Sequence, residues 1–140
     1  MTIPDGFSPH FRKSPLTDPW EPLYSRVLED RVQMGLMASE AHTNSRGFVH
    51  GGLLATLADN VMGLSCHVAL KDQSGLVTVN LTTDFLSSGR IGQWILFDAH
   101  VAKTGKTLCF ANCVITADDQ IIARAQGIFS NVGSRDTKRG

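Results

Sequence analysis

One proline-free segment, residues 53–70, constrains the fold of this chain more than any other feature. Its sequence, LLATLADNVMGLSCHVAL, has the length of a good helix, and its apolar residues extend most of the way around that helix. The segment is too polar to span a bilayer, since it includes a carboxylate, Asp59. We therefore expect a buried helix that the rest of the chain must surround.

Length and composition favour one globular domain over residues 1–140. Hydrophobic residues make up 42% of the chain, and 13 basic residues balance 13 acidic ones, so no overall charge favours nucleic acid or a membrane surface. The first residues lack the apolar stretch of a secretory signal. The cysteines (Cys66, Cys109 and Cys113) lack the spacing of a disulfide framework or a zinc site, and the histidines are scattered. We expect a soluble, cytoplasmic protein without metal or cofactor.

Strand-like alternation fills most of the remaining sequence. Residues 30–42 are expected to form a strand with the apolar side chains of Val32, Met34, Leu36 and Ala38 on one face, and residues 76–86 follow a turn at 71–75. In this second segment the alternation predicts one face of Val77, Val79, Leu81, Thr83 and Phe85, and an opposite face of Thr78, Asn80, Thr82 and Asp84. Three more strands are expected at about 94–103, 107–117 and 121–132, joined as hairpins. The tail, residues 134–140, is expected to fray.

The order of these elements indicates an α+β fold. Four successive strands should form an antiparallel sheet, and the most economical way to bury the helix is to curl that sheet around it. Residues 1–30 contain Pro15, Pro19 and Pro22 and are expected to form an arm over the domain, with one helical turn from Pro22. One sheet and one helix leave an edge open, which favours a homo-oligomer.

The loop before the helix, HTNSRGFVHGG, is polar and ends in two glycines. Unpaired amides at a helix N-terminus, together with the helix dipole, favour developing negative charge, although a glycine pair can also be a simple turn. Asp59 is costly in an apolar environment unless it is hydrogen-bonded, and a desolvated carboxylate is a stronger base. Two interpretations of Asp59 stay open at this point, a catalytic base and a carboxylate bonded to a neighbouring strand.

The stretch NSRGFVHGGLLATLADN resembles the signature of hotdog-fold acyl-CoA thioesterases of the phenylacetic acid degradation type. The segments VTVNLTTDFLSS and VAKTGKTLCFANCVI also resemble that family, so the resemblance covers residues 32–132 and leaves the arm unmatched. It implies a hotdog fold and hydrolysis of an acyl-CoA to a free acid and coenzyme A. The positions that match the signature are Asn44, Gly47, His50, Gly51, Gly52 and Asp59.

The resemblance also implies roles for these residues. Asp59 would activate water or attack directly, with Thr78 helping to hold the water. The amide of Gly51 would polarise the thioester carbonyl, and His50 and Asn44 would have auxiliary roles. The family builds each site from two subunits, so we expect a dimer, or a dimer of dimers, with sites at the interface.

Other residues are candidates for binding the substrate. Gly52 would let the carbonyl approach the backbone, and an apolar slot for the acyl group would be lined by Leu53, Leu54, Met62 and Phe85. Arg90, Lys103 and Lys106 could meet the phosphates of coenzyme A, although charged turn residues are usually only solvated.

Two rival functions stay open on sequence grounds. A hotdog dehydratase would use His50 with Asp59 on a hydroxyacyl chain. A non-catalytic module would bind or sense acyl-CoA without turnover.

Overall fold

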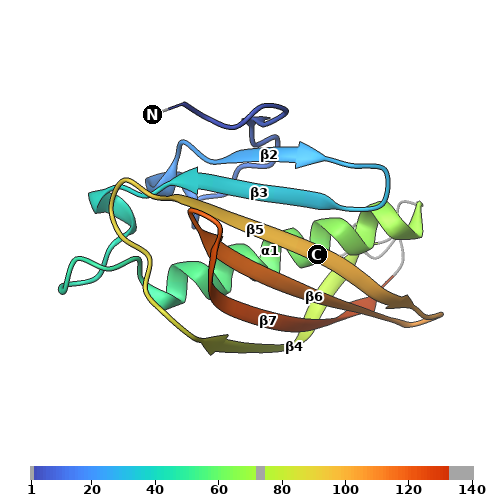
Figure 1. Cartoon of the computed structure of the whole chain (residues 1–140). Coiled ribbons are helices and arrows are strands. Elements are labelled where there is room, and N and C mark those ends of the chain that lie inside the picture. Colours follow the sequence, from blue (N-terminus) through green and yellow to red (C-terminus); the bar gives the residue numbers. More distant parts are fainter. Residues whose placement is uncertain (1, 72–74, 133–140) are drawn as a thin grey trace.

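The structure, a computed structural model, describes residues 2–71 and 75–132. One helix, α1 (Gly51–Leu70), lies against a single antiparallel sheet of seven strands, which curls around it (Figure 1). The strands are β1 (Ser8–Pro9), β2 (Tyr24–Val27), β3 (Val32–Met37), β4 (Leu76–Phe85), β5 (Trp94–Thr104), β6 (Leu108–Ala117) and β7 (Gln120–Asn131). Their spatial order is β1-β2-β3-β5-β6-β7-β4, and two short 3-10 turns, η1 (Asp18–Trp20) and η2 (Glu40–His42), precede the helix. The predicted α+β architecture is confirmed. The strand predicted over residues 30–42 is shorter, because it ends at Met37 and residues 40–42 form η2. The predicted tail and the centre of the turn after α1 lie outside the described residues.

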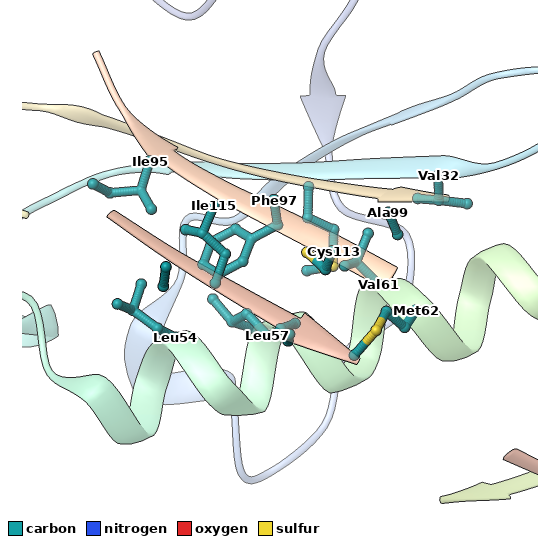
Figure 2. Close-up of a cluster of buried hydrophobic side chains, with 14 of the residues drawn as sticks. Val32, Leu54, Leu57, Val61, Met62, Ile95, Phe97, Ala99, Cys113 and Ile115 are labelled. Atoms are coloured by element: carbon teal, nitrogen blue, oxygen red, sulfur yellow. The ribbon is translucent and has the colours of Figure 1, made fainter. Parts of the chain in front are cut away.

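The core forms between α1 and the concave face of the sheet. Figure 2 shows Leu54, Leu57 and Val61 pointing from the helix toward Phe97 and Ile115 on the strands, and all five are buried. Full burial of a side chain of this size contributes about 1.5–3 kcal/mol relative to exposure. By length and composition alone α1 could cross a membrane. Here it is the central helix of the core, as the sequence predicts.

Local chemistry sets the ends of α1. His50 is the N-cap, and its Nδ1 accepts a hydrogen bond of 2.7 Å from the amide of Gly52. The helix ends at Leu70, and its C-cap, Lys71, adopts a left-handed conformation with φ of 58°. The loop that carries the predicted catalytic groups is therefore fixed to the first turn of the core helix.

The N-terminal region is more than an arm. Its residues form β1 and β2, which extend the sheet beyond β3, and Leu23 is buried in the core. The helical turn predicted from Pro22 is wrong, because the turn is η1, before that proline, and the residues after it continue into β2. Strand pairing with β3 overrides the local preference of proline for a helix start.

A β-bulge in β4 changes which side chains face the helix. The register shifts between Thr78 and Asn80, so that Thr78 pairs with Phe129 and Leu81 pairs with Gly127. A Cβ at Gly127 would lie 3.0 Å from Met62 of α1, so this face of β7 looks toward the helix. Directly paired residues share a face. The predicted separation of Thr78 and Leu81 onto opposite faces is therefore wrong, because the bulge adds one residue between them.

The glycine at position 35 leaves room for an aromatic cluster that holds the N-terminal region on the sheet. A Cβ built on Gly35 would lie 2.1 Å from Cζ2 of Trp94, so the indole ring lies directly on the glycine backbone. Trp94 in turn packs edge-on against Phe7, with 5.2 Å between ring centroids, and lies 6.2 Å from Tyr24. The contact between Gly35 and Trp94 thus supports both β2 and the residues before it.

We expect Gly35→Ala to destabilise the fold by about 1–3 kcal/mol, because the added methyl group displaces the Trp94 ring. The matched control is Gly63→Ala in α1, where the new Cβ would meet Phe129 at an ordinary 3.4 Å and alanine favours the helix. Urea unfolding of both variants checks the prediction. Equal stability of the two variants would contradict it.

Candidate active site

Asp59 and Thr78 meet where α1 faces the first part of β4. The hydroxyl Oγ1 of Thr78 donates a hydrogen bond of 2.7 Å to Oδ1 of Asp59. Asp59 is half-buried, and both residues line a cleft of about 440 Å³. Its second oxygen, Oδ2, makes no hydrogen bond within the described part of the chain. The carboxylate is thus held at one oxygen and is free to accept a proton or attack with the other.

The N-terminus of α1 presents an unused donor. Within the described residues, the amide of Gly51 has no hydrogen-bond acceptor, whereas that of Gly52 is taken by His50. Because Nδ1 of His50 is the acceptor, the neutral ring carries its proton on Nε2. The first turn therefore offers two N–H donors in an electrostatically positive position, one on the Gly51 backbone and one on the His50 ring.

Asn44 shapes the loop that leads into the helix. Its Oδ1 accepts hydrogen bonds from the amides of Arg46 (2.9 Å) and Phe48 (3.2 Å), and Gly47 follows with a positive φ of 84°. This geometry matches the turn-forming role open to an asparagine in a loop. Of the Asn44 side chain, the Nδ2 group is left to donate to a substrate or a water molecule.

One chain does not bring all the predicted catalytic residues together. Asp59 follows Gly51 by eight residue steps along the helix, which corresponds to about 12 Å along the axis. A carbonyl bound to the Gly51 amide is therefore out of reach of a water molecule held by Asp59 of the same chain. The two halves, Asn44, His50 and Gly51 on one side and Asp59 and Thr78 on the other, stand apart.

The predicted acyl-slot residues fall into different places. Leu54 and Met62 point into the core and line neither of the clefts (Figure 2). Leu53 and Gly52 line a second cleft of about 380 Å³ beside His50. Phe85 is exposed, and its ring lies 3.2 Å from where a Cβ on Gly51 would be.

The predicted phosphate ligands lie at opposite ends of the molecule. Arg90 stacks over the ring of Phe48, 5.4 Å from its centroid, and so lies beside the loop before α1. Lys103 and Lys106 lie at the far end of β5 and in the turn after it, one strand length, about 30 Å, away (Figure 1). Within a single chain, only Arg90 is near the candidate donors.

Other nucleophiles and metal ligands receive no support from the described residues. All three cysteines are buried, and burial raises the pKa of the Cys113 thiol to about 12 and that of Cys66 as well. The thiols of Cys66 and Cys113 therefore stay protonated and inert. Over residues 2–71 and 75–132, no group of three or more His, Cys, Asp or Glu side chains is placed to hold a metal ion.

Sequence reasoning missed part of the cleft that contains Asp59. Asn60, Gly63 and His67 line it. Gly63 and His67 follow Asp59 at helical spacing, a signal that was available. The opposite wall comes from the N-terminal region, and no local pattern links it to Asp59. These residues are His10, Arg12, Ser14 and Thr17.

Comparison with known proteins identifies the family. Residues 46–123 match the family model described as the thioesterase superfamily. The chain belongs to that superfamily. It is a thioester hydrolase with the hotdog fold.

The relatives agree with this assignment. Human acyl-coenzyme A thioesterase 13 is 36% identical over 98 residues, 69% of each chain. A Pseudomonas aeruginosa protein that carries a provisional esterase name, PA0474, is 36% identical over 130 residues, 92% of this chain and 97% of its own.

Solved structures show the same fold. Zebrafish thioesterase superfamily member 2 matches with a TM-score of 0.73 and 27% identity, over 78% of this chain and 80% of its own. The protein smu.793 of Streptococcus mutans, solved bound to acetyl-CoA, matches with a TM-score of 0.74 and 25% identity, over 81% of this chain and 91% of its own.

The buried histidine in the cleft wall, His10, is expected to make the free energy of unfolding depend on pH. Burial lowers the pKa of His10 below its ordinary 6.5; Glu21 opposes this shift, and Lys13 and Arg12 reinforce it. As the pH falls below 6.5, the unfolded chain binds a proton at this histidine that the folded chain resists, so the free energy of unfolding decreases. We expect the loss between about pH 7.5 and about pH 5 to be smaller in His10→Phe than in the wild type, as measured by urea unfolding. An equal loss in both proteins would contradict it.

Proposed function

We propose that this thioesterase hydrolyses an acyl-CoA to a free carboxylic acid and coenzyme A, at sites that two subunits build together. The observation that carries the proposal is the 2.7 Å hydrogen bond from Thr78 to Asp59 in an open cleft. It supports the catalytic interpretation of Asp59 because the bond orients one oxygen and leaves the other for chemistry. The proposed substrate class, acyl-CoA, is inferred from the relatives, which include acyl-coenzyme A thioesterases.

In the proposed reaction, Asp59 acts on the thioester carbon. Its free oxygen removes a proton from a water molecule as that water attacks, or attacks the carbon itself. The Thr78 hydroxyl already donates to Asp59, so its lone pairs remain to accept a hydrogen bond from the same water molecule. In the first route the bond between the acyl carbon and sulfur breaks, the free acid is released, and Asp59 returns the proton to the leaving thiolate of coenzyme A. In the second route loss of the thiolate leaves an anhydride between the acyl group and Asp59, which a water molecule then hydrolyses to the free acid.

The carbonyl oxygen gains negative charge in this step. The Gly51 amide and the positive end of the α1 dipole are suited to stabilise it, with the His50 ring N–H as a second donor. Because these donors lie about 12 Å along the helix from Asp59, the donors must come from one subunit and the carboxylate from its partner.

The exposed edge of the sheet supports this two-subunit arrangement. Within the described sheet, β4 pairs only with β7 and leaves its other edge free. An open edge with large apolar side chains is a surface for self-association. Two antiparallel β4 strands would also make their helices antiparallel and bring each helix N-terminus toward the middle of the other helix. The exposed apolar residues of this edge are Val77, Val79, Leu81 and Phe85.

We further propose that two such dimers form a tetramer of the phenylacetic acid degradation type. Exposed apolar side chains on β6 and at the start of β7, Val114 and Ile121, support a second contact. A dimer mass in light scattering would reject the tetramer.

The protein is proposed to act in the cytoplasm, where its three free thiols stay reduced.

The first prediction concerns the carboxylate and its partner. Wild-type protein should release thiol from a panel of short, medium, long and aromatic acyl-CoAs, and Asp59→Asn should lower kcat by about 10²–10⁴-fold. Thr78→Val should lower it by about tenfold or more, because the carboxylate loses its orienting bond. The control is Thr82→Val on the same strand, whose hydroxyl donates to Asn80 and has no other partner within the described residues. No thiol release from any member by the wild type would reject the proposed function.

A second prediction isolates the Gly51 donor. Gly51→Pro removes the amide hydrogen but suits the first helical position, and His50 already has the extended backbone (φ −67°, ψ 131°) that a following proline requires. We expect kcat to fall by about 10²–10³-fold with the fold retained. Gly51→Ala, which adds bulk but keeps the N–H, should lose much less.

Gly51→Pro and Asp59→Asn together test whether each active site is built from two subunits. Purified Asp59→Asn and Gly51→Pro proteins are each expected to be inactive, and their subunits are then mixed and exchanged. Half of the dimers would be mixed, and each would carry one intact site, so activity should recover to about a quarter of the wild-type value. A mixture that stays inactive after subunit exchange would place all the catalytic groups in one chain.

A further inference from the structure

The N-terminal segment, residues 8–20, contacts the loop that precedes α1. This active-site loop, residues 42–50, leads directly to the candidate donors at the start of the helix. Trp20 of the N-terminal segment lines the second cleft together with His42 and His50 of the loop. The contact between the two segments therefore lies beside the first turn of α1.

A buried histidine, His42, makes this contact with its side chain. The residue is only 3% exposed. Its Nδ1 accepts a hydrogen bond of 3.0 Å from the Ser39 amide, so the neutral ring carries its proton on Nε2, which donates to the carbonyl of Trp20 at 2.9 Å. One ring thus pairs a backbone donor at the start of η2 and a backbone acceptor at the end of η1. An apolar side chain would leave both groups unpaired.

The backbone of His42 holds the other end of the active-site loop. The His42 carbonyl accepts a hydrogen bond of 2.9 Å from the amide of His50, and the Asn44 amide donates to the carbonyl of Phe48 at 2.8 Å. A β-bridge lies between these two bonds. The loop is therefore a narrow hairpin, and His42 and His50 form its base.

The base of this hairpin sets the direction of the Gly51 amide. Besides its bond to His42, His50 accepts a hydrogen bond at its carbonyl from the Leu54 amide at 3.1 Å. The carbonyl of His50 and the amide of Gly51 belong to one planar peptide group, so a fixed carbonyl fixes the amide. A donor at a reacting centre works only when it is held to within about 0.5 Å of its productive position. The position of His42 thus affects the Gly51 amide through one residue, His50.

The active-site loop is also attached on the side of β4. The amide of Val49 donates to the carbonyl of Gly89 at 2.9 Å. This bond does not involve the His42 ring, so it remains when that ring is replaced. Loss of the bond to Trp20 should therefore shift the base of the loop without detaching the loop from the domain.

We propose that His42 is a positioning residue for thioester hydrolysis. Its bond to the Trp20 carbonyl uses the N-terminal segment as a support that holds the Gly51 amide in place for the thioester carbonyl. The inference rests on the proposed acyl-CoA hydrolysis. His42 acts through His50 and needs no contact with the substrate.

Two substitutions separate the two bonds of the His42 ring. His42→Gln can place its amide nitrogen where Nε2 lies, so it can keep the bond to Trp20. His42→Asn can place its oxygen where Nδ1 lies, so it can keep the bond to Ser39, but its shorter side chain does not reach the Trp20 carbonyl. The two variants therefore differ in the bond on which the inference depends.

We expect His42→Asn to lower kcat for acyl-CoA hydrolysis by about tenfold or more. KM should change by less than about threefold, because the donor acts mainly on the transition state. His42→Gln should retain kcat to within about threefold of the wild type. All variants are assayed at a temperature at which each is folded. Equal losses of kcat in the two variants, or an unchanged kcat in His42→Asn, would overturn the inference.

The control for a general loss of stability is Val32→Ala. Val32 is buried and lies at the opposite end of the core cluster from Leu54 and the first turns of α1 (Figure 2). Removing its methyl groups lowers stability, yet kcat should be unchanged. A loss of kcat in Val32→Ala as large as that in His42→Asn would show that the assay reports only stability, and the inference would fail.

A double-mutant cycle tests whether His42 acts through the donor. In the Gly51→Pro protein the amide is already absent, so adding His42→Asn should lower kcat by less than about threefold further. Independent effects would instead multiply. A further loss of about tenfold in the double variant would place the effect of His42 elsewhere.

Hydrogen exchange tests the link without catalysis. The amide of His50 should exchange about tenfold or more faster in His42→Asn than in the wild type, and His42→Gln and Val32→Ala should keep the wild-type rate. If the wild type hydrolyses none of the acyl-CoAs, the proposed function fails, while this measurement still tests the support of the loop by Trp20. An unchanged exchange rate of His50 in His42→Asn would overturn the inference whether or not the protein is active.

Discussion

Burial of α1 by a single sheet is the constraint on which the rest of this structure depends. A curled antiparallel sheet covers one side of a helix, and the core side chains of α1 are on that side. The remaining strip, which includes Asp59, Asn60 and Gly63, is only half-buried and lies close to β4 and the N-terminal segment. A polar group can be placed on that strip at modest cost. The candidate carboxylate, Asp59, therefore lies on the one side of the central helix that the sheet does not cover.

The carboxylate in the helix illustrates how structure and function meet on this strip. A bond from Asp59 to a neighbouring strand and a catalytic role are alternatives on sequence grounds, but the structure makes them compatible. The Thr78 hydroxyl stabilises one oxygen of Asp59, and the same bond fixes the direction of the other oxygen. The bulge between Thr78 and Asn80 is what turns Thr78 toward the helix, so a local irregularity in β4 sets the geometry of the candidate site.

The helix and most strands of this fold were predictable because their apolar residues recur at regular helical or strand spacing. The helix at residues 53–70 and the strands after it agree with α1 and β4 to β7 within a few residues, since periodicity reports burial directly. The bulge was not predictable, because one extra residue leaves no mark in an alternating pattern. The N-terminal residues show no regular alternation of apolar and polar side chains. Long-range contacts, such as the packing of Trp94 on Gly35, hold them in place. His10 and Arg12 therefore reach the cleft for reasons that only the tertiary structure contains.

The features around this cleft are costly for an isolated chain. The edge of β4 exposes apolar side chains. Within the described residues the Gly51 amide has no acceptor, and Nδ1 of His10 is buried without a hydrogen-bond partner. In the proposed dimer a second copy would cover this edge, and in the proposed reaction a thioester carbonyl would accept a hydrogen bond from the Gly51 amide. Because a ligand that binds only the folded state adds its binding free energy to stability, such costs persist where binding compensates for them. Their concentration around Asp59 and at the start of its helix is the physical reason to regard one chain as half of a site.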